Sequence, residues 1–309
     1  MPIRLSENFR ALFYAPFYAA HAIGAYAAEG VEVTLLPSPD PARTAAALRA
    51  GEIDAMWGGP LRVMLTHAQD PAADSVCFCD VIARDPFFIV GREPRPDFRI
   101  ADLAHVRFAS VAEVPTPWLC LQDDLRRAGV DPAALQRVSG PSMADNVVAL
   151  RAGSLEAVQL FQPYAEELVA SGAGQVWYAA ASRGLTAYTT LVTHRPLLQL
   201  RRDEFLRMTR AMARTLRWIA ATPGADVARA LVDFFPSVAP DIFAGAIDRY
   251  RALNLFAADP VMRPEGFDRL QAAMRSGGAL DRAIPFERCV DNSLAVTAID
   301  RHPPRSSDR

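Results

Sequence analysis

The sequence has 309 residues, of which 51% are apolar, which is enough to bury the cores of two domains. Its net charge of −2 provides no broad basic field, so we expect neither nucleic acid nor an anionic lipid surface as a partner. All 33 basic side chains are Arg, and the absence of Lys excludes a Schiff base with pyridoxal phosphate. The composition therefore predicts a globular protein with a small-molecule ligand and no bound cofactor.

Segments typical of targeting or metal chemistry do not occur in the sequence as written. Residues 1–8 contain no basic segment followed by a long apolar stretch, and no segment reaches the roughly 18 apolar residues of a membrane span. We therefore expect a cytoplasmic location as written, or a periplasmic one if a leader has been removed or the start is mis-assigned. The five histidines and four cysteines show no metal-ligand spacing, and the cysteines are expected in the core rather than in a redox or metal site.

The N-terminal segment alternates predicted strands and helices. Gly30 ends an apolar helical pattern, as a left-handed position after a helix prefers. The succession strand, helix, strand, helix, strand is the pattern of a parallel α/β sheet. The predicted strands are residues 3–6, 31–36 and 53–57, and the predicted helices are residues 17–29 and 41–50.

An internal repeat is the most informative feature of the sequence. Ala-Leu-Arg-Ala-Gly-Glu-Ile-Asp-Ala at residues 47–55 recurs as Ala-Leu-Arg-Ala-Gly-Ser-Leu-Glu-Ala at residues 149–157, which is 102 residues later. Each copy follows a strand and a Pro-containing loop, and each precedes a further strand and then Pro60 or Pro163. Two copies of one unit imply two similar lobes.

The chain is expected to cross between these lobes twice. Pro86 interrupts a β-rich run at residues 81–90, where the chain would leave the first lobe, and the strand at residues 188–193 would return it. The remainder is mostly helical, and residues 300–309 are expected to be a disordered tail. The other predicted strands are residues 106–111 and 175–180, and the predicted helices are residues 117–128, 203–220, 224–235, 240–254 and 264–276.

Several segments, taken in order, resemble one known fold. They are the opening strand, Phe-Tyr-Ala-Pro-Phe-Tyr-Ala-Ala-His at residues 13–21, Gly-Val-Glu-Val at residues 30–33, the two repeat segments, Arg-Asp-Pro at residues 84–86, and residues 103–108. The chain resembles the type 2 periplasmic-binding-protein fold. Within that fold it resembles the thiamine-pyrimidine-precursor, nitrate and sulfonate binding proteins of ABC transporters and, beside them, the thiamine-pyrimidine synthases.

The resemblance implies an α/β protein of two lobes with a ligand cleft between them and extra C-terminal helices. Lobe one would comprise residues 1–88 and 190–299, and lobe two residues 89–189. Such proteins close around their solute by hinge bending.

Candidate ligand contacts on lobe one lie after the first and third strands. Aromatic rings there can stack on a planar heterocycle or simply pack into the lobe. The glycine pair after the third strand either allows a close approach to the amides of the next helix or forms a plain turn. The candidates are Asn8, Tyr14, Tyr18, Trp57, Gly58 and Gly59.

Candidate contacts on lobe two and at the crossings complete the expected site. Gln162 supplies an amide that donates and accepts, and Thr116 opens a helix beside Trp118, either as an N-cap alone or as a cap and a ligand contact. Arg84 serves an anionic ligand, the hinge or a surface ion pair. Tyr188 begins the return strand and faces the cleft in one of its two possible orientations. No catalytic or metal-ligating residue is expected.

Three functions are compatible with these features. The preferred one is the solute-binding component of an ABC-type importer, not an enzyme, with a permease as partner and a planar thiamine-pyrimidine-like heterocycle or an organic anion as ligand. The alternative is a cytoplasmic enzyme on the same fold, related to thiamine-pyrimidine synthesis but unable to use a pyridoxal phosphate Schiff base because Lys is absent. The third is a cytoplasmic metabolite sensor that uses the C-terminal helices as a partner surface.

Overall fold

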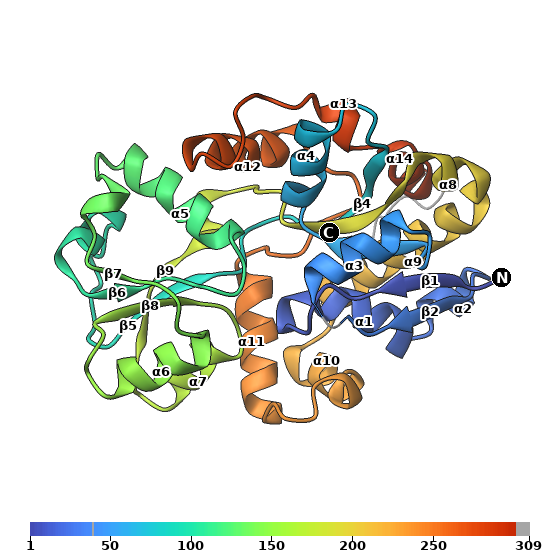
Figure 1. Cartoon of the computed structure of the whole chain (residues 1–309). Helices are drawn as coiled ribbons and strands as arrows, with labels where there is room; N and C mark the ends of the chain where they lie inside the picture. The colour runs from blue at the N-terminus through green and yellow to red at the C-terminus, as the bar shows by residue number, and fades with distance from the viewer. Residues whose placement is uncertain (39, 301–309) are drawn as a thin grey trace.

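The computed structural model describes residues 1–38 and 40–300. Figure 1 shows two α/β lobes, each with helices around a sheet. The first sheet has the strand order β2-β1-β3-β10-β4, and the second has the order β7-β6-β8-β5-β9. The strands of the first are β1 (Ile3–Ser6), β2 (Val33–Leu36), β3 (Ala55–Gly58), β4 (Ser75–Ile82) and β10 (Thr189–His194), and those of the second are β5 (Phe88–Gly91), β6 (Phe108–Ala109), β7 (Arg137–Val138), β8 (Ala157–Leu160) and β9 (Gln175–Ala179).

The two sheets are built alike. In each sheet three strands run parallel, and the fourth position is taken by an antiparallel strand that follows a crossing, β10 in the first sheet and β5 in the second. The two-lobed α/β fold that the resemblance implied is therefore confirmed. We propose that the lobe boundaries follow the two crossings, near residues 88 and 189.

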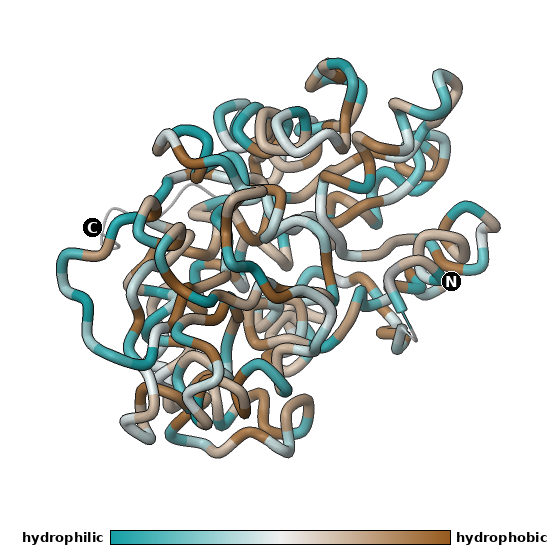
Figure 2. The backbone as a smooth tube through the Cα atoms, turned by 60° about the vertical axis from the view of Figure 1, so that its left-hand side comes forward, coloured by the Kyte–Doolittle hydropathy of each residue, from teal (hydrophilic) through white to brown (hydrophobic). Residues whose placement is uncertain are grey.

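The helices cover both sheets and fill the C-terminal region. The middle part of the chain contains α5 (Thr116–Arg127), α6 (Met143–Arg151) and α7 (Tyr164–Ala170). The N-terminal part contains α1 (Ala15–Ala22), α2 (Ala25–Ala28), α3 (Pro41–Arg49) and α4 (Pro60–Gln69). The C-terminal part contains α8 (Arg195–Leu200), α9 (Arg202–Ala221), α10 (Gly224–Ala230), α11 (Pro240–Ala252), α12 (Pro264–Ser276), α13 (Phe286–Cys289) and α14 (Ser293–Asp300). Figure 2 shows hydrophilic and hydrophobic stretches alternating along the backbone. The predicted tail at residues 300–309 lies outside the described residues, except that Asp300 ends α14.

The internal repeat corresponds to one structural unit in each sheet. Gly51 and Gly153 follow α3 and α6 with φ of +71° and +77° and donate to Leu48 and Leu150 at 3.1 and 3.0 Å. A carboxylate then accepts from the backbone of the neighbouring strand in both copies, Asp54 from Arg4 N at 2.8 Å and Glu156 from Arg107 N at 2.9 Å. The prediction of two similar lobes from the repeat is thus confirmed at the level of individual hydrogen bonds.

Two local predictions are wrong. The predicted helix at residues 17–29 is broken at Gly24, whose φ of +68° separates α1 from α2. Thr116 is not the N-cap of α5, because Pro115 precedes the helix with φ −78° and ψ −29°, and no side-chain cap bond forms. Thr116 is instead the first residue of the helix.

The C-terminal helices α11 and α12 contact both lobes. Helix α11 packs on α7 and on the helical turn Leu12–Tyr14, and α12 packs on α4 and α5. A Cβ added at Gly277, directly after α12, would come within 2.3 Å of Leu119 in α5. Figure 1 shows α11 between the two lobes. These helices therefore join the lobes and do not merely extend lobe one.

Within the described ranges, no helix combines the length and apolar character that crossing a membrane demands. No group of three or more His, Cys, Asp or Glu residues in those ranges is placed to hold a metal ion. The four cysteines are buried and free, as expected for core residues.

Candidate functional site

The candidate site lies where the ends of the central strands of lobe one meet the crossings. Strand β10 begins beside the end of β3, with Thr190 opposite Gly58. The two segments approach closely, since a Cβ added at Gly59 would lie 3.3 Å from the Tyr188 carbonyl oxygen. The fold therefore brings together Gly58, Gly59 and Tyr188, which the sequence places about 130 residues apart.

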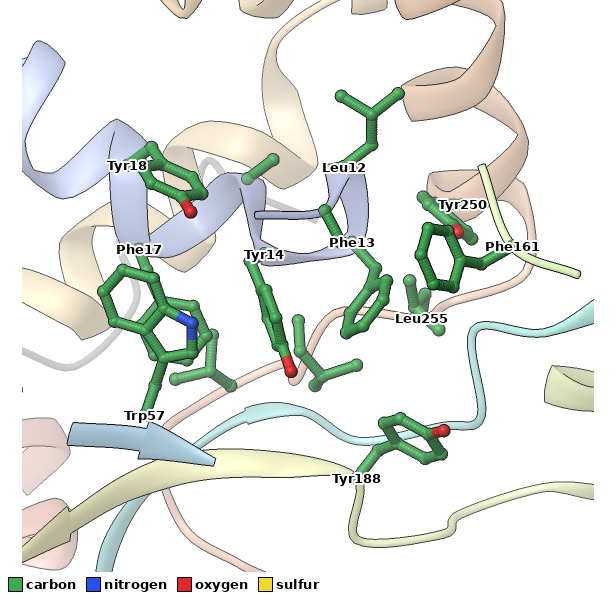
Figure 3. Close-up of a cluster of buried hydrophobic side chains, with 14 of the residues drawn as sticks. Leu12, Phe13, Tyr14, Phe17, Tyr18, Trp57, Phe161, Tyr188, Tyr250 and Leu255 are labelled. Carbon is green, nitrogen blue, oxygen red and sulfur yellow. The ribbon is translucent and has the colours of Figure 1, made fainter. Parts of the chain in front are cut away.

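An aromatic cluster fills this region. The Tyr14 ring lies 6.0 Å from Trp57 and 4.1 Å from Phe13, and Phe13 lies 5.4 Å from Phe161 of lobe two and 6.2 Å from Tyr188. Figure 3 shows Tyr14 between Trp57 and Phe13, with Phe161 on the far side of Phe13 and Tyr188 on the opposite strand. The aromatic cluster is defined here as Phe9, Phe13, Tyr14, Phe17, Trp57, Phe87, Phe161 and Tyr188.

Part of the aromatic cluster is a structural core. Trp57 has no exposed surface and stacks on Phe17 with 4.7 Å between centroids and 10° between planes. Tyr18 packs edge-on against Trp57 and is equally buried. Phe17, Tyr18 and Trp57 therefore all belong to the buried core.

Three buried polar atoms have no hydrogen-bond partner among the described residues: Trp57 Nε1 and Tyr188 Oη in the aromatic cluster, and Thr189 Oγ1, which follows Tyr188. The side chain of Asn8, by contrast, donates to Tyr14 Oη at 3.1 Å. A buried polar group without a partner costs about 1–3 kcal/mol, so native interiors rarely keep several together. Atoms of this kind at the end of a strand are suited to bind a polar group of a ligand.

Tyr18 is already engaged by a carboxylate that the sequence interpretation did not single out. Tyr18 Oη donates to Glu7 Oε2 at 2.6 Å, and Arg10 pairs with the same carboxylate at 3.2 Å. Burial raises the pKa of Tyr18, so its hydroxyl stays protonated and remains a donor. Glu7 and Arg10 flank an aromatic-rich segment, but a single Glu and a single Arg carry no motif that could have marked them in the sequence.

A groove between the lobes opens beside Phe161. It encloses about 460 Å³, and we call it the interlobe groove. Residues of both lobes and of the C-terminal region line it: Arg10, Ala11, Leu12, Met143, Phe161, Gln162, Pro163, Tyr164, Glu167 and residues 234–238. Ligand pockets of proteins commonly have this size, and they favour junctions between domains.

Gln162 lines the groove, but its side chain is used at the start of α7. Its amide oxygen accepts from Glu166 N at 2.8 Å, and its amide nitrogen lies 3.3 Å from Glu166 Oε2. Tyr250 Oη accepts from the Gln162 backbone N–H at 3.1 Å and donates to the Pro86 carbonyl at 3.2 Å. The side-chain amide of Gln162 therefore positions α7. Its backbone N–H links this segment, through Tyr250, to the first crossing.

Three other candidate residues lie apart from the aromatic cluster. Arg84 donates to the Ala181 carbonyl at 3.1 Å and lines a different cavity of about 760 Å³. Trp118 lies under the Arg137 guanidinium at 4.1 Å, and Thr116 is on the same helix. Within the described part of the chain, no hydrogen bond or ring pair links Arg84, Thr116 or Trp118 to the aromatic cluster.

The two crossings are hydrogen-bonded to each other, and together they are called the hinge here. Thr186 N donates to Ala83 O at 2.8 Å, and Tyr188 N donates to Ile82 O at 3.0 Å. Arg183 pairs with the buried Asp85 at 2.5 Å. Burial raises the pKa of Asp85, while the Arg183 charge opposes that shift. This hinge holds Tyr188 at the junction of the lobes.

The chain is similar to known proteins over most of its length. Residues 9–232 match the NMT1-like family. YtlA of Bacillus subtilis (strain 168), a protein named as a binding protein, is 24% identical over 295 residues, which cover 95% of this chain and 88% of YtlA.

Solved structures share the fold. The periplasmic aliphatic sulphonate binding protein SsuA from Escherichia coli has a TM-score of 0.74 at 17% identity, with 93% of this chain and 96% of SsuA covered. The periplasmic nitrate-binding protein NrtA from Synechocystis PCC 6803 has a TM-score of 0.69 at 12% identity, with 99% and 90% covered. The desulfurization enzyme DszB has a TM-score of 0.67 at 14% identity, with 97% and 99% covered.

The architecture is thus that of the two-lobed periplasmic binding proteins. The match over residues 9–232 identifies the family more closely: the chain belongs to the NMT1-like family.

Proposed function

We propose that the chain is the solute-binding component of an ABC-type importer, with its ligand held between the lobes. One observation carries the proposal. The interlobe groove is lined by residues of both lobes, and one of them, Phe161, is a member of the aromatic cluster. A ligand in this position would contact both lobes, so binding would favour the closed arrangement.

The chemistry of the groove favours a small organic solute with an apolar or planar body and hydrogen-bond acceptors. Trp57, Tyr188 and Thr189 do not line the groove, but a ligand that reaches past Phe161 into the aromatic cluster would meet their polar atoms. Trp57 Nε1 is a donor only, and the hydroxyls of Tyr188 and Thr189 both donate and accept. Arg10 adds a positive charge at the groove, of which Glu7 balances a part. An organic anion of the sulfonate type fits these donors, and so does a nitrogen heterocycle stacked on an aromatic ring. SsuA, which binds aliphatic sulphonates by its name, supports the anion as the first choice.

An enzyme on the same fold is the second candidate, because DszB shares the architecture. Covalent cysteine catalysis would need an accessible thiolate. Burial raises the pKa of all four thiols, that of Cys289 to about 12, which disfavours this chemistry. The binding function is therefore the better supported of the two.

A permease and a periplasmic location belong to the same proposal. SsuA and NrtA are periplasmic by name, which supports the periplasmic alternative over a cytoplasmic location. A fractionation experiment on the native host with an antibody against this chain would test the compartment. Recovery in the cytoplasmic fraction alone would contradict the importer function and favour the enzyme or the sensor.

A thermal-shift screen tests the binding function directly. The purified chain is heated with alkanesulfonates, arylsulfonates, nitrate and aminopyrimidines, and each mixture is analysed by mass spectrometry for conversion. A ligand at 100 times its Kd should stabilise the fold by about 2.7 kcal/mol. We expect a stabilising compound that is recovered unchanged. A stabilising compound that is converted to product would replace the binding function with the enzymatic one.

A further inference from the structure

We propose that lobe one carries a second ligand site, a hollow between α3 and α4 that takes a small monoanion with an apolar body. The hollow encloses about 290 Å³ and shares no lining residue with the interlobe groove. Its apolar wall includes Leu48, Met56, Val63 and Val192. This site is additional to the one proposed for the importer solute.

The charged lining of the hollow consists of Arg49, Arg62, Asp70 and Asp74, and both carboxylates already have partners: Asp74 pairs with His194, and Asp70 Oδ1 accepts from Ala72 N at 2.8 Å. The two arginines therefore give the hollow its preference for an anion. Arg49 ends α3 and Arg62 lies in the first turn of α4, and both line the hollow. In the described part of the chain, neither guanidinium forms an ion pair with a carboxylate. Burial and, next, the charge of Arg49 lower the pKa of Arg62, so the two like charges destabilise one another. A bound anion would relieve this repulsion.

A buried hydroxyl at the start of β4 provides an independent indication of a ligand. Ser75 lines the hollow and is only 9% exposed, yet its Oγ has no hydrogen-bond partner among the described residues. The nearby His194 cannot serve it, because its Nδ1 pairs with Asp74 and its Nε2 lies 3.2 Å from Leu48 O. Ser75 is therefore available to a polar group of a ligand.

The length of the hollow sets the shape of the ligand. Arg62 in the first turn of α4 and Asp70, directly after the end of α4, both line it, and eight residues at the rise of a helix span about 12 Å. Apolar side chains line the hollow together with these polar ends. An eight-carbon carboxylate is a suitable probe, because it combines one negative charge with an apolar chain of about this length.

Two methionines make the site directly observable. Met56 lines the hollow and Met143 lines the interlobe groove, so their methyl groups report on the two sites separately. The full chain, labelled with ¹³C at the methionine methyl groups, is titrated with octanoate. We expect the Met56 signal to shift with saturation while the Met143 signal stays in place. A shift of Met143 without one of Met56, or no shift of either at millimolar octanoate, would overturn the proposal.

Variants test the charge and the hydroxyl. Arg49→Gln combined with Arg62→Gln should weaken octanoate binding about tenfold or more, and Ser75→Ala about threefold to tenfold. Octanol, which has the same length and no charge, should bind at least about tenfold more weakly than octanoate. The matched control is Arg43→Gln, on the same helix α3 but outside the hollow, and it should leave binding unchanged. Equal affinity of the double variant and the control would overturn the proposal.

Discussion

Arg249 of α11 and Glu166 of α7 form a two-point ion pair between the C-terminal region and lobe two. Arg249 Nε lies 2.7 Å from Glu166 Oε2, and Nη2 lies 3.1 Å from Oε1. Gly245, one turn earlier on α11, leaves room for this carboxylate, since a Cβ there would come within 3.1 Å of Oε1. The neighbouring Tyr250 binds both Gln162 of lobe two and Pro86 of the first crossing. Helix α11 therefore links the position of lobe two to the hinge.

The first prediction concerns this ion pair. Arg249→Gln should lower the free energy of unfolding by about 1–2 kcal/mol, because the pair is bidentate and partly buried, with side chains 31% and 14% exposed. Urea denaturation of the single variants and of the double variant with Glu166→Gln measures the coupling energy. The exposed pair Arg229–Asp226, with side chains 77% and 48% exposed, serves as control, and Arg229→Gln should change stability by less than about 0.5 kcal/mol. A coupling energy near zero would contradict the role of α11 as a link between the lobes.

The second prediction separates packing from recognition at Trp57. Trp57→Phe keeps an aromatic ring against Phe17 but removes the N–H that has no partner within the described chain. Affinity for the solute found by the thermal-shift screen should fall by about 1–3 kcal/mol, because the ligand loses a donor in a buried site. Isothermal titration calorimetry measures the loss.

Trp177→Phe is the matched control, since Trp177 Nε1 is already bound to Glu93 O at 2.7 Å in lobe two. The affinity of the Trp177→Phe variant for the same solute should equal that of the unaltered chain. Unchanged affinity in Trp57→Phe would remove Trp57 from the recognition of the solute.

The third prediction concerns pH. Asp80 is buried in β4, its Oδ1 has no partner among the described residues, and burial raises its pKa to about 7. Its unfolded pKa is about 3.9, so between about pH 4 and pH 7 the folded state binds the proton more tightly and stability falls as the pH rises. Asp80→Asn cannot ionise and should therefore gain about 2–3 kcal/mol relative to the unaltered chain between pH 5 and pH 8.

Denaturation curves of both proteins across this pH range provide the test. The difference between them should grow up to about pH 7 and then level off, as the raised pKa requires. Parallel stability profiles would mean that Asp80 does not titrate in this range.

The fourth prediction uses the turn of the repeat. Gly51 has φ of +71° and no heavy atom within 4 Å of an added Cβ, so Gly51→Ala introduces backbone strain without a steric clash. The substitution should lower stability by about 1–2 kcal/mol. Gly51→Asn should cost less, because Asn tolerates the left-handed region better than Ala. Equal losses for Ala and Asn in urea denaturation would argue against a conformational cause.

Much of the fold could be predicted from the sequence because its signals are local. The strand at residues 3–6 and the helix at residues 264–276 have the predicted bounds. The repeat predicted the paired lobes, since the left-handed glycine and the following strand are fixed by neighbouring residues. The break at Gly24 escaped prediction because the apolar pattern continues through it, and a glycine inside such a pattern is often helical.

The candidate site was less accessible from the sequence. Asn8, Tyr14 and Trp57 come together within the N-terminal segment, where β1 pairs with β3, and Tyr188 joins them because a strand returns from lobe two and pairs with β3. Arg84 and Trp118 carry equally suggestive side chains, yet they lie elsewhere. Local sequence does not encode which of two opposite faces a side chain takes once strands have paired over a long separation.

The sequence by itself determined the class of fold, the two crossings and the absence of lysine chemistry, because patterning, repeats and composition are properties of the chain alone. Only the tertiary structure decided that α11 and α12 join the lobes, that Tyr18 is bound by Glu7, and that Trp57, Tyr188 and Thr189 keep buried polar atoms without partners in the described chain. The physical reason is that burial and hydrogen bonding depend on which distant segments pack together, and a buried polar atom is informative only once its neighbours are known.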